Sequence, residues 1–114
     1  MVVDHDRTTF EVVKLAAVGL DVECEQLSDS TRFPQTYEAF QPDVVLFEIM
    51  LPDFDGLEII DWLADRVSDS RLVIVSDERR RNVRSALALA KAHGLKAEFL
   101  PKPLLPEMVR QTLS

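Results

Sequence analysis

The most informative stretch of the chain is residues 42–57, which read PDVVLFEIMLPDFDGL. Residues 43–47 are almost wholly apolar, as expected of a strand in a parallel sheet that helices cover on both faces. A loop at 51–55 follows, and Asp55 is placed to cap a helix because Glu58 stands three positions further on. This succession of strand, loop and helix predicts an α/β fold.

The same alternation of short apolar strands and amphipathic helices continues on both sides of this stretch. The pattern predicts strands at 1–3, 21–25, 72–75 and 97–100, and helices at 8–20, 34–40, 79–93 and 106–113. Thr8 and Glu11 are expected to form a capping box at the first helix. The helix after Asp55 is expected to bury Leu57, Ile60, Ala64 and Val67. Five βα units within 114 residues predict a single domain, built on an open, doubly wound parallel sheet.

Composition narrows the class of protein. Apolar residues make up 46% of the chain and charged residues 29%, which is typical of a globular protein and excludes a disordered tail. No apolar run approaches the roughly 20 residues that cross a bilayer, so we expect no membrane association. Cys24 is the only cysteine, which excludes an internal disulfide and predicts a reducing, cytoplasmic setting.

Charge is divided unevenly along the chain, whose net charge is −7. Residues 1–69 hold 16 acidic and 4 basic side chains, whereas residues 70–114 hold 4 acidic and 9 basic side chains. An acidic chain binds nucleic acid poorly, because phosphate contacts need clustered lysine and arginine. The composition therefore favours protein partners over direct nucleic-acid binding.

Chemistry-bearing side chains gather at the predicted strand ends. In doubly wound sheets the functional site lies at the carboxyl ends of the strands. Those ends hold Asp4, His5, Asp6, Glu48, Ser76 and Lys102. Carboxylates hold hard cations or attack phosphorus, while a hydroxyl and an ammonium group hold phosphoryl oxygens. The set therefore indicates chemistry related to phosphoryl transfer.

This set, in this order, resembles the receiver domain of two-component response regulators over essentially the whole chain. Glu48 stands at the phospho-acceptor position, and the run from Met50 to Gly56 is similar to the family's Met-Pro-x-x-Asp-Gly pattern. Ser76 matches the conserved hydroxyl position, Phe99 the aromatic switch position, and Lys102-Pro103 the lysine with its cis-proline partner. The resemblance implies a flavodoxin-like (βα)5 fold with strand order 2-1-3-4-5, and a regulatory rather than an enzymatic role.

Two positions depart from the family pattern. Glu48 replaces the phospho-accepting aspartate, and its extra methylene moves the carboxylate roughly 1.5 Å outward, which makes it a poor acceptor and a permanent mimic. The family's second acid is replaced by His5. The resemblance implies a Mg²⁺ site formed by Asp4, Glu48 and the Met50 backbone, but His5 weakens it, because imidazole suits zinc, nickel or copper better. We therefore predict an atypical receiver that works as a phosphorylation-independent interaction module.

Other interpretations stay open at this stage. The pocket is also explained by drift in a domain kept as a scaffold, or by a pH-responsive switch based on His5. A receiver that still accepts phosphate, on Glu48 or on Asp53, is the main functional alternative. A haloacid-dehalogenase-like phosphatase would use Asp4 as nucleophile and Asp6 as general acid. That class is disfavoured because only Glu107 follows Lys102 where an acidic pair is needed.

The resemblance also implies where partners bind. Receivers signal through their fourth helix, fifth strand and fifth helix, which here correspond to 79–93, 97–100 and 106–113. This face would include four guanidinium groups, on Arg79, Arg80, Arg81 and Arg84. We expect an acidic partner surface there, on a cognate histidine kinase, an output domain or a second copy of the chain. The final helix is about one turn shorter than usual, which leaves open that the chain is a fragment of a longer regulator.

Overall fold

The computed structural model describes residues 1–49, 56–66, 69–77 and 80–113. In these ranges, strands and helices alternate along the chain. The strands are β1 (Val2–Val3), β2 (Gln26–Leu27), β3 (Val44–Glu48), β4 (Arg71–Ser76) and β5 (Ala97–Pro101). The helices are α1 (Arg7–Ala16), α2 (Phe33–Phe40), α3 (Gly56–Asp65), α4 (Arg80–Ala92) and α5 (Pro106–Leu113), with a short 3-10 turn at Ser30–Arg32.

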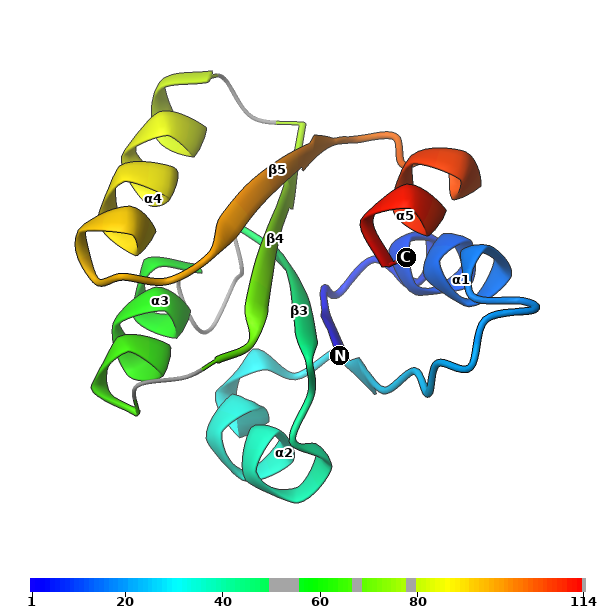
Figure 1. Cartoon of the computed structure of the whole chain (residues 1–114), viewed down its shortest axis with the longest axis horizontal. Coiled ribbons are helices and arrows are strands. Elements are labelled where there is room, and N and C mark those ends of the chain that lie inside the picture. Colours follow the sequence, from blue (N-terminus) through cyan, green and yellow to red (C-terminus); the bar gives the residue numbers. More distant parts are fainter. Residues whose placement is uncertain (50–55, 67–68, 78–79, 114) are drawn as a thin grey trace.

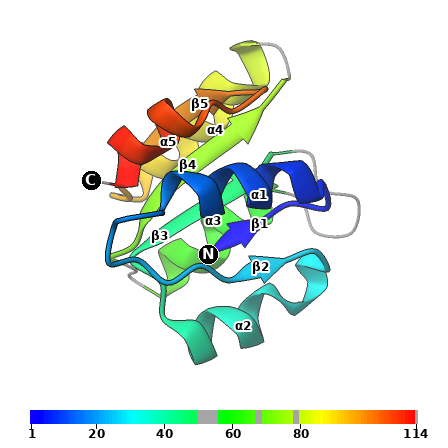
Figure 2. The ribbon, with the colours of Figure 1, turned by 90° about the vertical axis from the view of Figure 1, so that its right-hand side faces the viewer.

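The strands form one parallel sheet in the order β2-β1-β3-β4-β5. Helices cover both of its faces: α3 and α4 lie on one side, while α1 and α5 lie side by side on the other (Figures 1 and 2). The predicted flavodoxin-like fold and its strand order are therefore confirmed.

Side chains that alternate along the strands divide the core into two layers. Val45 and Phe47 of β3 pack with α2, α3 and α4, whereas Leu46 between them packs with α1 and α5. The same alternation separates Val3 from Val2 in β1. Because both faces of a parallel sheet are buried, these strands read as continuous apolar runs rather than as alternating ones.

The strand predicted at 21–25 is misplaced, since β2 comprises only Gln26–Leu27. The reason lies in its neighbour. β1 is two residues long, and its Val2 and Val3 pair with Gln26 and Leu27, so β1 offers no further partner to an edge strand. The apolar residues before β2 stay outside the sheet, and Val22 is exposed.

Two helices differ in detail from the prediction. α1 begins one residue earlier than predicted and ends at Ala16. Its N-cap is Asp6, whose side chain accepts a hydrogen bond from the Thr8 N–H at 2.9 Å. This cap takes the place of the predicted capping box of Thr8 and Glu11. In α3 the buried face is formed by Ile59, Ile60 and Leu63, whereas Leu57 is exposed. The buried face of this helix is therefore rotated by about one residue from the predicted face. The predicted cap Asp55 and the predicted core residue Val67 lie outside the described residues.

Candidate functional site: a buried ion triad at the carboxyl edge of the sheet

The parallel register brings four predicted site residues to one edge of the sheet. Asp4 directly follows β1, Glu48 ends β3, Ser76 ends β4, and Lys102 directly follows β5. Neighbouring parallel strands present their carboxyl ends together, so residues 26 to 98 positions apart in sequence converge here.

Lys102 joins the two carboxylates of this edge. Its Nζ lies 2.7 Å from Asp4 Oδ2 and 2.8 Å from Glu48 Oε2. The exposed fraction is 0% for the side chain of Asp4, 7% for that of Glu48 and 16% for that of Lys102. Burial alone would lower the pKa of Lys102, but hydrogen bonds to Asp4 and Glu48 and their negative charges outweigh it and raise that pKa. The three groups, called the ion triad below, therefore hold a charged lysine.

The backbone around Lys102 is held by the neighbouring strand. Its N–H donates to the Ser76 carbonyl oxygen at 3.0 Å, which continues the β4–β5 pairing by one residue. The peptide bond between Lys102 and Pro103 is cis, as the resemblance implied. The side chain of Lys102 is thus directed from the end of an edge strand across β4 toward β3 and β1.

Asp4 accepts hydrogen bonds at both of its carboxylate oxygens. Its Oδ1 accepts from the backbone N–H of Asp6 at 3.0 Å, and its Oδ2 accepts from the Thr9 hydroxyl at 2.8 Å as well as from Lys102. A buried carboxylate is costly unless it is hydrogen-bonded and paired, and Asp4 meets both conditions.

Thr9 is the site residue that sequence reasoning missed. It is buried in the first turn of α1, four residues before the buried Val13, and so lies on the same helix face. A hydroxyl on the apolar face of a helix that follows a buried acid is a signal that was available in the sequence.

The other two predicted members of the acidic pocket do not join the triad. His5 has 59% of its side chain exposed, and its Nδ1 lies 3.7 Å from Asp4 Oδ1, beyond hydrogen-bond distance. Asp6 is exposed and caps α1; the hydrogen bond from the Thr8 backbone lowers its pKa. Asp6 nevertheless lines a cavity of about 290 Å³ with Thr9 and Lys102, so it borders the pocket although its carboxylate caps α1.

The switch positions lie on β4 and β5. Ser76 is buried at the end of β4. Phe99 is half-buried in β5 and packs against the core layer beneath α2, α3 and α4. Ser76 thus lies at the edge of the sheet that holds the ion triad, and Phe99 lies three residues before Lys102 in sequence.

The predicted arginine face is described only in part. Arg84 lies on α4 and is exposed. Arg80 and Arg81 begin α4, but their side chains are outside the described part, and Arg79 and Met50 lie wholly outside it.

The donor chemistry of the pocket does not fit Mg²⁺. This ion demands near-octahedral oxygen coordination, whereas the second acidic position holds the imidazole of His5. Asp4 and Glu48 are both bound to an ammonium group. Within the described ranges, no group of three His, Cys, Asp or Glu side chains is arranged to hold a metal ion. The described donors, Asp4 and Glu48 with an imidazole nearby, therefore offer fewer oxygen ligands than Mg²⁺ takes.

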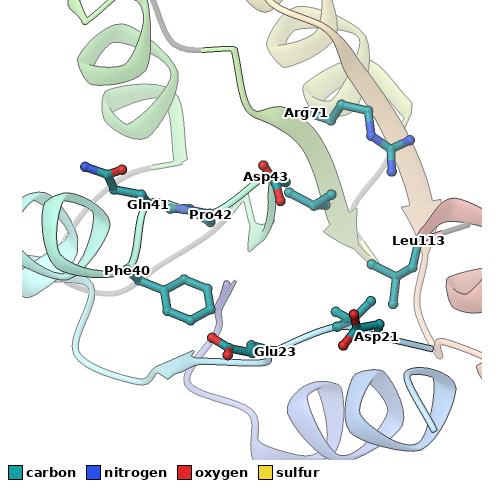
Figure 3. A pocket seen from close by; sticks show the side chains of 10 residues that line it. Asp21, Glu23, Phe40, Gln41, Pro42, Asp43, Arg71 and Leu113 are labelled. Carbon is teal, nitrogen blue, oxygen red and sulfur yellow. The ribbon is translucent and has the colours of Figure 1, made fainter. Parts of the chain in front are cut away.

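A larger cavity lies at the opposite, amino edge of the sheet, with a volume of about 500 Å³ (Figure 3). Asp21, Glu23 and Asp43 surround it, together with Arg71 at the start of β4 and Leu113 at the end of α5. Arg71 donates to the Thr112 carbonyl oxygen at 2.6 Å, so its guanidinium holds the end of α5. This cavity is open and its acids are exposed, so it lacks the buried, paired charges of the ion triad.

Comparison with known proteins agrees with the resemblance noted in the sequence. The family model described as response regulator receiver domain matches residues 1–114. No curated protein matches the chain. Among solved structures, the signal receiver domain of a protein described as a LuxO repressor, from Vibrio parahaemolyticus, has a TM-score of 0.83 at 16% identity over 98% of this chain and 83% of that one.

Two further structures are similar over the same share of the chain. A CheY-like receiver domain protein from Methanospirillum hungatei has a TM-score of 0.80 at 19% identity, covering 98% of this chain and 86% of that one. Chemotaxis protein CheY4 from Vibrio cholerae has a TM-score of 0.80 at 19% identity, covering 98% of this chain and 92% of that one. At these identities the structures bear on the fold alone.

Proposed function

Because the chain belongs to the response regulator receiver domain family of two-component signalling, we propose that it is an atypical receiver that regulates a protein partner without being phosphorylated. The proposal depends on two residues that differ from the family pattern, Glu48 and His5, and on the contacts that Glu48 makes.

Glu48 supports the proposal through its length and its burial. It occupies the acceptor position with one methylene more than aspartate, so its carboxylate lies roughly 1.5 Å further along the side chain. A displacement of about 1 Å from reactive geometry can reduce a rate by about a hundredfold. Only 7% of the side chain is exposed, which restricts approach of a phosphodonor.

The observation that carries the proposal is the Lys102–Glu48 contact of 2.8 Å within the ion triad. The Glu48 carboxylate already supplies Lys102 with a negatively charged oxygen, the kind of partner that a phosphoryl group offers. Asp4 binds the same ammonium at 2.7 Å, so the charges of the pocket are held in one arrangement. We therefore expect a receiver with this pocket to keep one conformation, instead of exchanging between an unphosphorylated and a phosphorylated one.

We place the partner-binding surface on α4, β5 and α5, by extension from the family. The exposed Arg84 on α4 supplies positive charge there, and the sequence adds Arg79, Arg80 and Arg81 just before it. Charge complementarity favours an acidic partner surface, on a kinase, an output domain or a second copy of the chain. Within the described residues, no helix is long and apolar enough to span a membrane; a cytoplasmic location stays a prediction.

The phosphatase alternative has no support in the geometry. It needs Asp6 as a general acid, but the Asp6 carboxylate caps α1 through the Thr8 N–H. It also leaves the position of Glu48 without a role.

The test is intact-mass spectrometry after incubation with acetyl phosphate and Mg²⁺. The wild type is expected to gain no phosphoryl group, an added mass of about 80 Da. The matched control is the double variant His5→Asp/Glu48→Asp, which restores both family acids and is expected to gain the adduct. An adduct on the wild-type chain, at Glu48 or elsewhere, would make it a phospho-accepting receiver and would overturn the proposal.

A further inference from the structure

The amino edge of the sheet carries two cavities that share a wall. The larger one, of about 500 Å³, is shown in Figure 3. The second, of about 330 Å³, is lined by the end of α2 and by residues 69–70, which precede β4. Residues 41–43, which join α2 to β3, line both cavities. The two cavities with their shared wall are called the amino-edge surface below.

Hydrogen bonds hold the shared wall in place. Gln41 ends α2 in the left-handed conformation, with a φ of 50°. The buried hydroxyl of Ser70 donates to the Pro42 carbonyl oxygen at 2.6 Å. The Arg71 N–H donates to the Asp43 carbonyl oxygen at 2.8 Å, just before the β3–β4 pairing begins. A surface that is already ordered loses little conformational entropy when a partner binds.

Negative charge dominates the amino-edge surface, because five acidic and two basic side chains line the two cavities. Both basic groups are engaged within the chain. Arg66 pairs with Glu38 at 2.6 Å, and Arg71 donates to a carbonyl oxygen of α5 at 2.6 Å. Four exposed acids make no ion pair within the described part of the chain, namely Asp21, Glu23, Asp43 and Asp69. The surface therefore presents a net negative charge to a partner.

The chain also carries a surface of the opposite charge. Arg84 is exposed on α4, and the segment 77–84 as a whole holds four arginines and two acids. α4 begins beyond the carboxyl end of β4, whereas the amino-edge surface includes the start of β4 (Figure 1). The acidic and the basic surface thus lie at opposite edges of the sheet, so they meet only between two chains.

From this complementarity we infer that the amino-edge surface binds the arginine-bearing start of α4 in a second copy of the chain. The contact joins two different surfaces, so it is heterologous and builds open chains or rings rather than a two-fold dimer. Exposed ion pairs are individually weak, so association is expected at high chain concentration and low salt. The inference rests on the proposed function for the partner-binding role of α4, and it adds which acidic surface α4 meets.

Sedimentation velocity of the wild-type chain over a range of concentrations tests the inference. In low salt the average sedimentation coefficient is expected to rise with concentration, and high salt is expected to weaken association at least about tenfold by screening exposed charges. Asp43→Lys and Arg84→Glu are each expected to weaken it at least about tenfold, since each places like charges across the contact. The matched controls Glu11→Lys and Lys14→Glu make the same charge changes at exposed positions of α1 and are expected to have little effect.

Mixing the two weakened variants identifies the contact. Arg84→Glu keeps the amino-edge surface and Asp43→Lys keeps the arginines, so the mixture is expected to associate more strongly than either variant alone. Circular dichroism checks that each variant is folded, and Asp69→Lys repeats the charge reversal in the second cavity.

Three results would overturn the inference. The first is a wild-type chain that stays monomeric in low salt. The second is association that Asp43→Lys and Asp69→Lys weaken no more than Glu11→Lys does. The third is a mixture of Asp43→Lys and Arg84→Glu that associates no more strongly than the separate variants.

This inference and the proposed function fail in distinguishable ways. A wild-type chain that gains the phosphoryl adduct but associates through these two surfaces overturns the proposed function alone. A wild-type chain that gains no adduct and stays monomeric overturns the self-association alone, and leaves the amino-edge surface to a basic partner of another sequence.

Discussion

The two edges of the sheet carry acidic side chains in opposite physical states. At the carboxyl edge, Asp4 and Glu48 are buried and share one lysine. At the amino edge, Asp21, Glu23 and Asp43 surround the larger cavity and are exposed (Figure 3). The charges around the larger cavity therefore interact more weakly than those of the ion triad, because water screens exposed charges more than buried ones. The larger cavity and the buried, paired charges therefore lie at opposite edges of the sheet.

The largest predicted effect separates the two edges by stability. Lys102→Met is expected to reduce the free energy of unfolding by about 3–5 kcal/mol, because it removes the ammonium group that contacts both buried carboxylates. Asp43→Asn at the amino edge is expected to change it by no more than about 0.5 kcal/mol, as exposed substitutions usually do. Urea unfolding at pH 7 in metal-free buffer measures both. Equal effects at the two edges would remove the distinction between them.

A smaller effect tests whether the carboxyl edge is held from α1. Thr9→Val removes the 2.8 Å hydrogen bond to Asp4 and keeps the volume, and is expected to cost about 2 kcal/mol of unfolding free energy. Thr9→Ser retains the hydroxyl and is expected to recover most of that loss. If serine and valine behave alike, packing rather than the hydrogen bond explains the role of Thr9.

A still smaller effect than that of Thr9→Val concerns Asp6, which caps α1 and is not part of the ion triad. Asp6→Ala removes the α1 cap and is expected to cost about 1 kcal/mol, whereas Asp6→Asn keeps a capping oxygen and costs less. The hydrogen bond from Thr8 lowers the pKa of Asp6 in the folded state below its ordinary value of 3.8. Its contribution to stability is therefore present above pH 3.8 and is lost as the pH falls through the lower folded-state pKa.

Stability of wild type and Asp6→Ala measured between pH 2 and pH 7 checks this sign. The difference between them is expected to shrink in acid. A difference that grows as the pH falls would show that Asp6 stabilises the fold as a neutral acid, and not as a charged cap.

The sequence predicted the residues at the carboxyl ends of β3 and β5 better than it predicted the length of β2 or the contacts of Asp6 and Thr9. Glu48 and Lys102 were located correctly because continuous apolar runs mark buried parallel strands, and the residues after such runs must meet at one edge. β2 was misplaced because its length depends on its two-residue partner β1, which local pattern does not reveal. Asp6 both caps α1 and lines the cavity beside Lys102, and its adjacency to Asp4 in sequence does not reveal the capping role.

Thr9 was missed for a related reason. Its role depends on the distance between its hydroxyl and Asp4 Oδ2, which the turn from β1 into α1 sets. The distances within the ion triad are likewise products of the assembled sheet, because they join residues from three strands that are far apart in sequence.

We expect this pocket to keep one conformation and not to respond to a phosphoryl group. The most direct measurement compares ¹H–¹⁵N spectra of the wild type with and without beryllofluoride and Mg²⁺, since beryllofluoride mimics a phosphoryl group on a carboxylate. We predict superimposable spectra, including the amides of Ser76, Phe99 and Lys102. Displaced signals at these three positions, with further changes spreading along α4, would contradict the claim.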